Sequence, residues 1–239
     1  MKKGIFITGT DTDVGKTIVT AGIAGALKKK GVDVAIMKPV ASGAKKTAGG
    51  LISDDVRFLM HAIGSTDDVR LVNPVVLEAP VAPWAATLLG DGTRIDPGAI
   101  KGCYDQLSRL HDFTLVEGIG GLLVPLTEKY WVLDMIKDLN LSVVVVSRPG
   151  LGAINHSLLT IRAAISSGIE VMGFIISGRD EMNSGDATRT NPAVIETLSR
   201  VPLLGVLPFD PKVDILNLEL GDVVALTWKH IDLQKILAG

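Results

Sequence analysis

Short apolar runs rich in β-branched residues alternate along the chain with longer segments in which apolar residues recur with a helical period. Each apolar run is short enough to be a buried strand, and the predicted strands cover residues 4–8, 33–37, 113–117, 141–147, 171–177 and 203–207. The predicted helices cover residues 16–30, 55–62, 133–139, 154–167 and 192–200, and glycine stops several of them, at Gly31, Gly64 or Gly168. This alternation predicts an α/β domain whose mostly parallel central sheet is flanked by helices on both faces.

The length of the chain and the spacing of these elements indicate a single domain over residues 1–239. With 47% hydrophobic residues the chain can bury a substantial core, and the predicted elements leave few residues for a second domain. The least regular segments are 41–53 and 178–190.

Charge and cysteine content exclude several classes of function. A formal net charge of −2 gives no global basic field, so neither nucleic acid nor an anionic membrane is an expected partner. The single cysteine, Cys103, can form no disulfide within one chain and cannot supply a Cys/His zinc site, which indicates a reducing compartment. The N-terminus lacks the pattern of a signal peptide, and no uncharged apolar run approaches the ~20 residues that cross a bilayer. We therefore expect a cytoplasmic protein.

A glycine-rich segment joins the first predicted strand to the first predicted helix. It runs from Gly9 to Thr17 and ends in Gly15-Lys16-Thr17, as does the phosphate-loop pattern G-x-x-x-x-G-K-[ST]. Five residues separate Gly9 from Gly15 where the pattern has four, so Thr10 stands at the usual first position. Backbone N–H groups at such a helix start bind phosphates, the lysine reaches the β and γ groups, and the threonine can coordinate magnesium. The segment therefore predicts a nucleotide phosphate site.

Two further motifs lie at the same edge of the predicted sheet. Lys38 directly follows the strand 33–37, and Glu117 ends the strand 113–117, just before glycines that let a backbone approach a ligand closely. Because ligands gather at the carboxyl ends of parallel strands, Lys38 is a candidate second cation and Glu117 a candidate magnesium carboxylate. A second carboxylate is expected from Asp54 or Asp55, and the residues alone do not choose between them.

The remaining polar residues indicate no other catalytic site. The histidines lack metal-ligand spacing such as H-E-x-x-H, and we assign none of them to catalysis; they are His61, His111, His156 and His230. The chain also has no G-x-S-x-G turn, so a serine hydrolase has no support.

Taken together, these motifs closely resemble those of dethiobiotin synthetase. The similarity spans most of the chain, and the segments that carry it, in matching order and spacing, are 9–17, 38–43, 117–121, 152–156 and 202–208. The resemblance implies a P-loop fold and an ATP- and magnesium-dependent ligase of biotin synthesis. Such an enzyme closes a cyclic urea from 7,8-diaminononanoate and carbon dioxide or bicarbonate. A homodimer is implied as well.

The same resemblance implies roles for individual residues. Lys16 and Lys38 become the catalytic cations, and Thr17, Asp55 and Glu117 surround magnesium. Counting without gaps from Lys38 favours Asp55 over its neighbour for that position.

The resemblance also implies how the two substrates are held. Thr12, Lys38 and Ser42 contact the diamine or its carbamate, and Asn155 reaches across the homodimer to the carboxylate end of the substrate. The nucleotide lies against a larger set, namely Asp13, Val14, Gly15, Lys16, Thr17, Ile18, Asp55, Glu117, Gly118, Ile119, Gly120, Ser177, Leu207, Pro208 and Phe209.

The chain departs from the family pattern in two places. It has Pro80-Val81-Ala82-Pro83-Trp84 where members often carry Pro-x-Ser-Pro-His, so apolar groups replace a hydroxyl and an imidazole. It has Ser177 where an asparagine commonly reads the adenine edge, and serine cannot offer the paired donor and acceptor of an amide. The second departure weakens the support for a strict preference for ATP.

Three other kinds of P-loop protein are alternatives. Partitioning ATPases usually carry a second lysine early in the loop, where this chain has Thr10-Asp11-Thr12. Amide-forming ligases of the cobyrinate type normally continue into a glutaminase domain with a nucleophilic cysteine, whereas the sequence ends at Gly239. An inactive relative would keep the loop and lose Lys38 or Glu117, and both are present.

Overall fold

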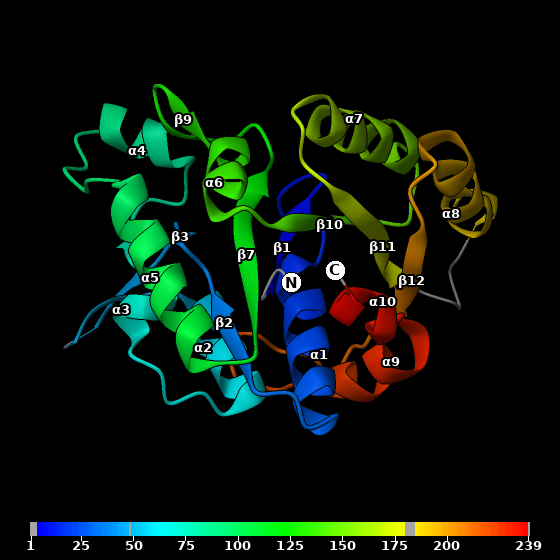
Figure 1. Ribbon diagram of the computed structural model, residues 1–239, viewed down its shortest axis with the longest axis horizontal. Coiled ribbons are helices and arrows are strands. Elements are labelled where there is room, and N and C mark those ends of the chain that lie inside the picture. The colour runs from blue at the N-terminus through cyan, green and yellow to red at the C-terminus, as the bar shows by residue number, and fades with distance from the viewer. Residues whose placement is uncertain (1–3, 48, 180–184, 239) are drawn as a thin grey trace.

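The computed structural model describes residues 4–47, 49–179 and 185–238, and a six-stranded parallel sheet forms their centre (Figure 1). The strands of this sheet are β1 (Gly4–Gly9), β2 (Val34–Met37), β7 (Phe113–Gly121), β10 (Ser142–Ser147), β11 (Val171–Arg179) and β12 (Leu203–Pro208). All of the predicted strands are therefore confirmed, although their ends differ by up to four residues.

The winding of the sheet changes direction beside β1. The strand order is β12-β11-β10-β1-β7-β2, and all neighbouring strands are parallel. The chain moves from β1 outward to β2, returns to β7, and then passes to β10 on the other side of β1. Such a switch point opens a crevice at the carboxyl ends of the strands, and the ligands of open α/β sheets bind there.

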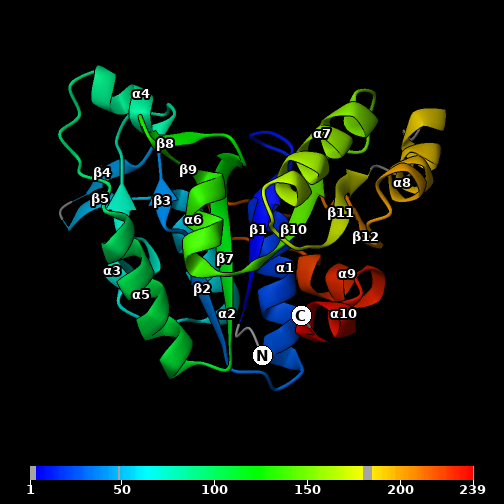
Figure 2. The same ribbon diagram turned by 45° about the horizontal axis from the view of Figure 1, so that its top comes forward.

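Helices cover both faces of the sheet, as predicted (Figure 2). Alternate residues of a strand point to opposite faces, and the core divides accordingly: Phe6 packs into one hydrophobic cluster, while Ile5 and Ile7 pack into the other. One face carries α1 (Lys16–Lys29), α2 (Asp54–Ile63), α9 (Val223–His230) and α10 (Leu233–Ala238). The other carries α4 (Pro83–Leu88), α5 (Pro97–Leu110), α6 (Val132–Leu139), α7 (Ala153–Ser166) and α8 (Asp186–Ser199).

Sequence analysis missed several helices and misplaced the start of another. The 14-residue α5 was missed although Asp96 accepts hydrogen bonds from the backbone N–H groups of Gly98 and Ala99, an N-cap followed by proline. Helix α8 begins at Asp186, so the start predicted at Pro192 was wrong. The short helices α3 (Val69–Val72), α4, α9 and α10 were also missed.

The two segments taken as least regular contain regular structure. Strands β4 (Lys45–Thr47) and β5 (Gly50–Ile52) form an antiparallel hairpin within residues 41–53. The first turns of α8 occupy the end of residues 178–190, of which 180–184 lie outside the described residues. Further small pairs join β3 (Val40–Ala41) to β6 (Val75–Val76) and β8 (Pro125–Thr127) to β9 (Tyr130–Trp131).

A bulge in β7 carries the strand past the glutamate at which it was predicted to end. Ile7 pairs with Glu117 and Gly9 pairs with Gly121, so four residues of β7 span what two residues of β1 span. The extra residues between Glu117 and Gly121 turn out of the ladder at the carboxyl edge of the sheet. Bulges of this kind aim side chains and backbone toward a site. A side-chain carbon at Gly118 would lie 2.7 Å from the ring of Phe6, so a glycine is needed at this position.

At the opposite end of β2, His111 lies between two aspartates. Its Nδ1 is 2.9 Å from Oδ1 of Asp33, and its Nε2 is 3.0 Å from Oδ1 of Asp67. Burial alone lowers the pKa of His111, but the hydrogen bonds with the two carboxylates outweigh it and raise the pKa above 6.5. His111 thus links the start of β2 to the segment that contains Asp67.

The raised pKa of His111 predicts a pH-dependent contribution to stability. The folded state holds its proton more tightly than the unfolded state, so the stabilisation is complete below about pH 6.5 and is lost as pH rises through the folded pKa. We expect His111→Gln to lower the free energy of unfolding by about 1 kcal/mol more at acid than at alkaline pH. Urea unfolding of both proteins at the two pH values measures this difference, and equal losses at both would contradict it.

Candidate active site

The loop between β1 and α1 is folded around its own lysine. Gly15 is the N-cap of α1 with φ +92°, and Asp13 also has a positive φ of 56°. The Lys16 ammonium donates to the carbonyl oxygen of Asp11 at 2.9 Å. Burial lowers the pKa of Lys16, and the charge of Glu117 opposes this effect. The loop thus brings a buried lysine to the start of a helix, where N–H groups favour an anion.

Gly15 also lies against the end of β11. A side-chain carbon added there would lie 2.5 Å from the hydroxyl oxygen of Ser177, far inside van der Waals contact. The glycine therefore satisfies two demands, a left-handed backbone and a close approach between the loop and the strand. This contact places Ser177 directly beside the phosphate loop.

We expect Gly15→Ala to weaken nucleotide binding at least about tenfold, because the loop must shift away from Ser177 and its backbone becomes strained. Gly31→Ala is the matched control, since Gly31 has a similar φ of +87° and nothing within 4 Å of the added carbon. The control should lose a little stability and keep its nucleotide affinity. Calorimetric titration with ADP compares them, and equal affinities for the two variants would contradict the role of the contact.

Lys38 lies between two carboxylates at the end of β2. Its Nζ donates to Oε1 of Glu117 at 2.7 Å and is hydrogen-bonded to Oδ2 of Asp55. The same Oε1 accepts a hydrogen bond from Oγ1 of Thr17 at 2.9 Å. Lys38 and Glu117 are 6% and 0% exposed. The network therefore joins four chain segments; its Lys38–Glu117 pair is buried, where charged hydrogen bonds are strong, whereas the Asp55 side chain is 38% exposed.

The carboxylates determine the protonation of Lys38. Burial alone lowers the pKa of Lys38, but the charges of Glu117 and Asp55 outweigh it and raise the pKa above 10.5. Asp54 does not belong to this network, because it pairs with Lys45 at 2.6 Å and with Arg57 at 3.4 Å. Ser53 caps α2 and so fixes which of the two aspartates faces Lys38.

The residues at this point suit a hard divalent cation. Glu117, Asp55 and Thr17 present oxygen atoms, which are the ligands that magnesium prefers. Among the described residues, Oε2 of Glu117 is buried and has no hydrogen-bond partner. A buried carboxylate oxygen without a partner is costly, and coordination of a cation would satisfy it. No group of three or more His, Cys, Asp or Glu in the described part of the chain is arranged to hold a metal, at this point or elsewhere, so the donor set here consists of two carboxylates and one hydroxyl.

Two cavities meet at the phosphate loop and share Asp13, Gly15, Ile18 and Ile215. The first, which we call the reaction cleft, has a volume of about 580 Å³. Its lining includes the predicted residues Thr12, Asp13, Gly15, Lys16, Thr17, Ile18, Lys38, Ser42, Asp55, Glu117, Gly118, Ile119 and Gly120. These predicted residues come from four separate segments of the chain, and in the structure they line one cleft.

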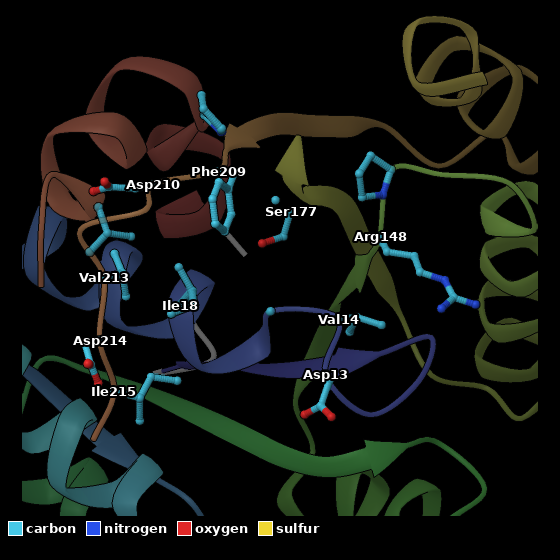
Figure 3. A pocket seen from close by; sticks show the side chains of 15 residues that line it. Asp13, Val14, Ile18, Arg148, Ser177, Phe209, Asp210, Val213, Asp214 and Ile215 are labelled. Atoms are coloured by element: carbon cyan, nitrogen blue, oxygen red, sulfur yellow. The ribbon is translucent and has the colours of Figure 1, made fainter. Parts of the chain in front are cut away.

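The second cavity, which we call the base pocket, has a volume of about 540 Å³ (Figure 3). Its lining includes the predicted residues Asp13, Val14, Gly15, Ile18, Ser177, Pro208 and Phe209. Figure 3 shows the Phe209 ring and the Ser177 hydroxyl bordering the same space, with Ile18 nearby. An aromatic ring and aliphatic side chains around an open space suit a flat heterocyclic base.

Sequence reasoning missed part of both cavities. Ile215 borders both of them, Pro80 lines the reaction cleft, and the other missed residues of the base pocket are Arg148, Pro149, Gly178, Asp210, Val213, Asp214 and Val223. Most of these come from the ends of β10 and β11 and from the segment after β12. The rule that ligands gather at the carboxyl ends of parallel strands could have found Arg148 and Gly178.

Two predicted residues lie outside these cavities. Leu207 is 1% exposed and packs into the core on the face of α1, and it lines neither cavity. Asn155 is exposed in the first turn of α7 and also lines neither cavity. A role of Asn155 in substrate binding would therefore require a second chain.

Comparison with solved structures shows the same fold. The chain is similar to the MinD protein of the MinC:MinD cell division complex from Aquifex aeolicus, with a TM-score of 0.65 and 18% identity over 99% of this chain and 96% of that chain. A cell division ATPase MinD from Pyrococcus furiosus gives a TM-score of 0.60 at 18% identity, covering 100% and 99%. At such identities the likeness concerns the fold alone.

Comparison of sequences is more specific. A family model described as an AAA domain matches residues 3–215. An ATP-dependent dethiobiotin synthetase from Thermodesulfovibrio yellowstonii is 41% identical over the full length of both chains. Proteins of the same name from Bacillus velezensis and Nitrosopumilus maritimus are 37% and 36% identical, covering 98% of this chain and 97% and 99% of theirs. The chain, with its phosphate loop, its Lys38–Glu117 pair and its full-length similarity to these proteins, belongs to the dethiobiotin synthetase family.

Proposed function

We propose that this protein is the ATP-dependent ligase that closes the cyclic urea of dethiobiotin from 7,8-diaminononanoate and carbon dioxide, in biotin biosynthesis. The observation that carries the proposal is the reaction cleft, in which Lys16 and Lys38 meet two carboxylates directly beside a phosphate loop. Curated relatives with the same activity in their names match the chain over its full length, which supports the same assignment.

The reaction needs positioned charge and no protein nucleophile. One amine of the diamine takes up carbon dioxide as a carbamate, and a carbamate oxygen then attacks the γ-phosphorus while ADP leaves. The second amine attacks the carbonyl carbon, and inorganic phosphate leaves as the ring closes. Negative charge develops on the transferring phosphoryl group and on the tetrahedral oxygen, and cations and backbone N–H groups of a preorganised site stabilise such charge.

The two lysines are placed for these tasks. Lys16 lies at the start of α1 with the loop N–H groups, where the β and γ phosphates would bind, and Lys38 donates a hydrogen bond to Glu117 in the same cleft. Lys16 and Lys38 are 7% and 6% exposed, so their charges act with little screening by water. Thr12 and Ser42 line the same cleft and supply hydroxyl groups for the carbamate or the free amine.

Magnesium would be held by Thr17, Asp55 and Glu117, in agreement with their oxygen ligands and with the unpartnered Oε2 of Glu117. When bound, it would neutralise phosphate charge during transfer. The names of the relatives state that they depend on ATP, whereas magnesium is our inference from these oxygen donors.

The base pocket supports ATP as the phosphate donor, because its apolar lining suits an adenine ring. Few polar groups in its lining are available to distinguish adenine from another base. The carboxylates of Asp210 and Asp214 accept hydrogen bonds from their own loops, from backbone N–H groups of Lys212, Asp222, Leu216 and Asn217. Ser177 lies at the pocket wall but lacks the paired donor and acceptor of an amide.

The assignment is tested by phosphate release from each nucleoside triphosphate, with and without the diamine and bicarbonate, followed by mass analysis of the product. We expect release to depend on both partners and to yield one dethiobiotin for each phosphate. Phosphate release that ignores the diamine would instead favour a switch ATPase of the kind suggested by the fold neighbours.

We also propose that the protein is a cytoplasmic homodimer in which α7 forms part of the contact. Three large apolar residues at or near this helix are exposed: Leu151 at 86%, Leu159 at 60% and Ile165 at 50%. Asn155 lies one helical turn before Leu159, so both share a face. Leu159 therefore exposes apolar surface beside Asn155, which supports an interface at this face. No helix that the structure describes has the length and apolar character to span a bilayer.

We expect Leu159→Glu to give a monomer with a raised KM for the diamine and an unchanged KM for ATP, because Asn155 would lose its partner site. Sedimentation velocity and steady-state kinetics measure the two effects. Leu198→Glu is the control, since Leu198 is exposed to a similar extent, 56%, on α8. A Leu159→Glu protein that remains a dimer would contradict the proposed contact, and a fully active monomer would contradict the role of Asn155.

A further inference from the structure

The Lys38 ammonium lies where a divalent cation would bind. It contacts Oε1 of Glu117 and Oδ2 of Asp55, which are the two carboxylates of the proposed magnesium site. Thr17, the third oxygen donor, is hydrogen-bonded to the same Oε1. A divalent cation bound at Oε1 of Glu117 and Oδ2 of Asp55 would compete with the ammonium for the same lone pairs, and two cations at this distance would repel each other.

The free carboxylate oxygen points to the same conclusion. Oε1 of Glu117 is shared by two donors, whereas the buried Oε2 has no hydrogen-bond partner among the described residues. The ammonium therefore compensates the buried charge only in part. A buried carboxylate held this way is ready to exchange one cation for another that satisfies more of its lone pairs.

We propose that Lys38 is a built-in competitor of the metal, and that metal binding releases its side chain from Asp55 and Glu117 into the reaction cleft. Lys38 would then be free to bind an anion, such as the carbamate, only after the metal is in place. The inference rests on the proposed function for the identity of the metal. It adds an order of events: the second anion site forms when the metal site fills, so the phosphate donor and its metal precede productive binding of the carbamate.

Direct metal binding tests the competition without any turnover. The probe is Mn²⁺ alone, followed by electron paramagnetic resonance in the absence of nucleotide, on the full chain. We expect Lys38→Met to bind Mn²⁺ at least about tenfold more tightly than the wild type, because the competing charged hydrogen bonds are gone. Lys45→Met is the matched control, since Lys45 pairs with the neighbouring Asp54 and is 62% exposed at its side chain. The control should stay within about twofold of the wild type.

The outcomes separate this inference from the proposed magnesium site. If Mn²⁺ binding is lost in Glu117→Gln but is no tighter in Lys38→Met than in the wild type, the competition is overturned and the metal site stands. If Glu117→Gln leaves Mn²⁺ binding unchanged, both are overturned. Equal tightening in Lys38→Met and Lys45→Met would show a general charge effect and would also overturn the competition.

A measurement on the wild-type chain does not depend on the folding of a variant. Acetylation of lysines by a soluble reagent is followed by mass spectrometry of the peptides, with and without saturating Mg²⁺. We expect the labelling of Lys38 to rise at least about threefold with Mg²⁺, because the ammonium leaves the carboxylates. Lys45 serves as the internal reference and should not change. Labelling of Lys38 that is the same with and without Mg²⁺ would overturn the release of its side chain.

Discussion

Replacing Lys38 with alanine is expected to lower turnover by about 10²-fold or more, which corresponds to about 2.7 kcal/mol of transition-state stabilisation. The physical reason is the loss of a buried positive charge beside the phosphate loop, where little water remains to replace it. Single-turnover kinetics with saturating ATP and diamine measure the chemical step directly.

The removal of Lys38 also leaves the buried Glu117 without its closest cation, so folding must be verified together with turnover. Far-UV circular dichroism and thermal unfolding serve this purpose. Lys45→Ala is the control, because it removes an equal charge from an exposed pair on Asp54, and its turnover should stay within about twofold of the wild type. Near-normal turnover in folded Lys38→Ala would remove this lysine from the mechanism.

The second large effect is expected for Glu117→Gln. The substitution keeps the size of a fully buried side chain and removes one negative charge, so the fold should be retained while the magnesium concentration for half-maximal activity rises about tenfold or more. Magnesium titration of the coupled phosphate release measures this shift.

Asp54→Asn is the matched control for Glu117→Gln. Asp54 is also an acid close to the cleft, but it pairs with Lys45 and Arg57 and does not contact Lys38. Its magnesium titration should match that of the wild type. A titration of Glu117→Gln that coincides with the control would remove Glu117 from the metal site.

Much of the sheet could be predicted from the sequence because its strands are buried on both faces. In Ser142–Ser147 four consecutive valines are flanked by serines and every residue is buried, which is the pattern of a parallel sheet covered by helices. The glycine stops were equally readable, since Gly31, Gly64 and Gly168 all adopt the positive φ that few other residues tolerate.

The two helix errors have different causes. Helix α5 has its buried residues Ile100, Tyr104 and Leu107 at helical spacing and begins after an aspartate cap and a proline, so its sequence carries a helix signal that was overlooked. The start of α8 was wrong because Pro192 was taken as a first helical residue, whereas it lies within the helix and is buried. Helix α5 was therefore predictable from its local pattern, whereas the part of α8 before Pro192 was not, because proline is usually a first-turn residue.

Part of the base pocket could not be predicted from the sequence. Ile215 and Val213 belong to a segment without a motif, and they reach the pocket because the chain after β12 folds back toward α1. Their apolar side chains have no chemical signature, so the sequence could not separate them from ordinary core residues. Phe209, by contrast, lies two residues after the predicted strand 203–207.

By itself the sequence determined the class of the fold, the phosphate loop and the identity of the charged residues, because each depends on local pattern or on residue type. Only the tertiary structure decided how those charges pair. Lys38 lies 79 positions before Glu117 and 17 before Asp55, and the three meet because β2 lies beside β7 and Ser53 caps α2. Hydrogen bonds over such separations depend on strand order and on a bulge in β7, which no local pattern encodes.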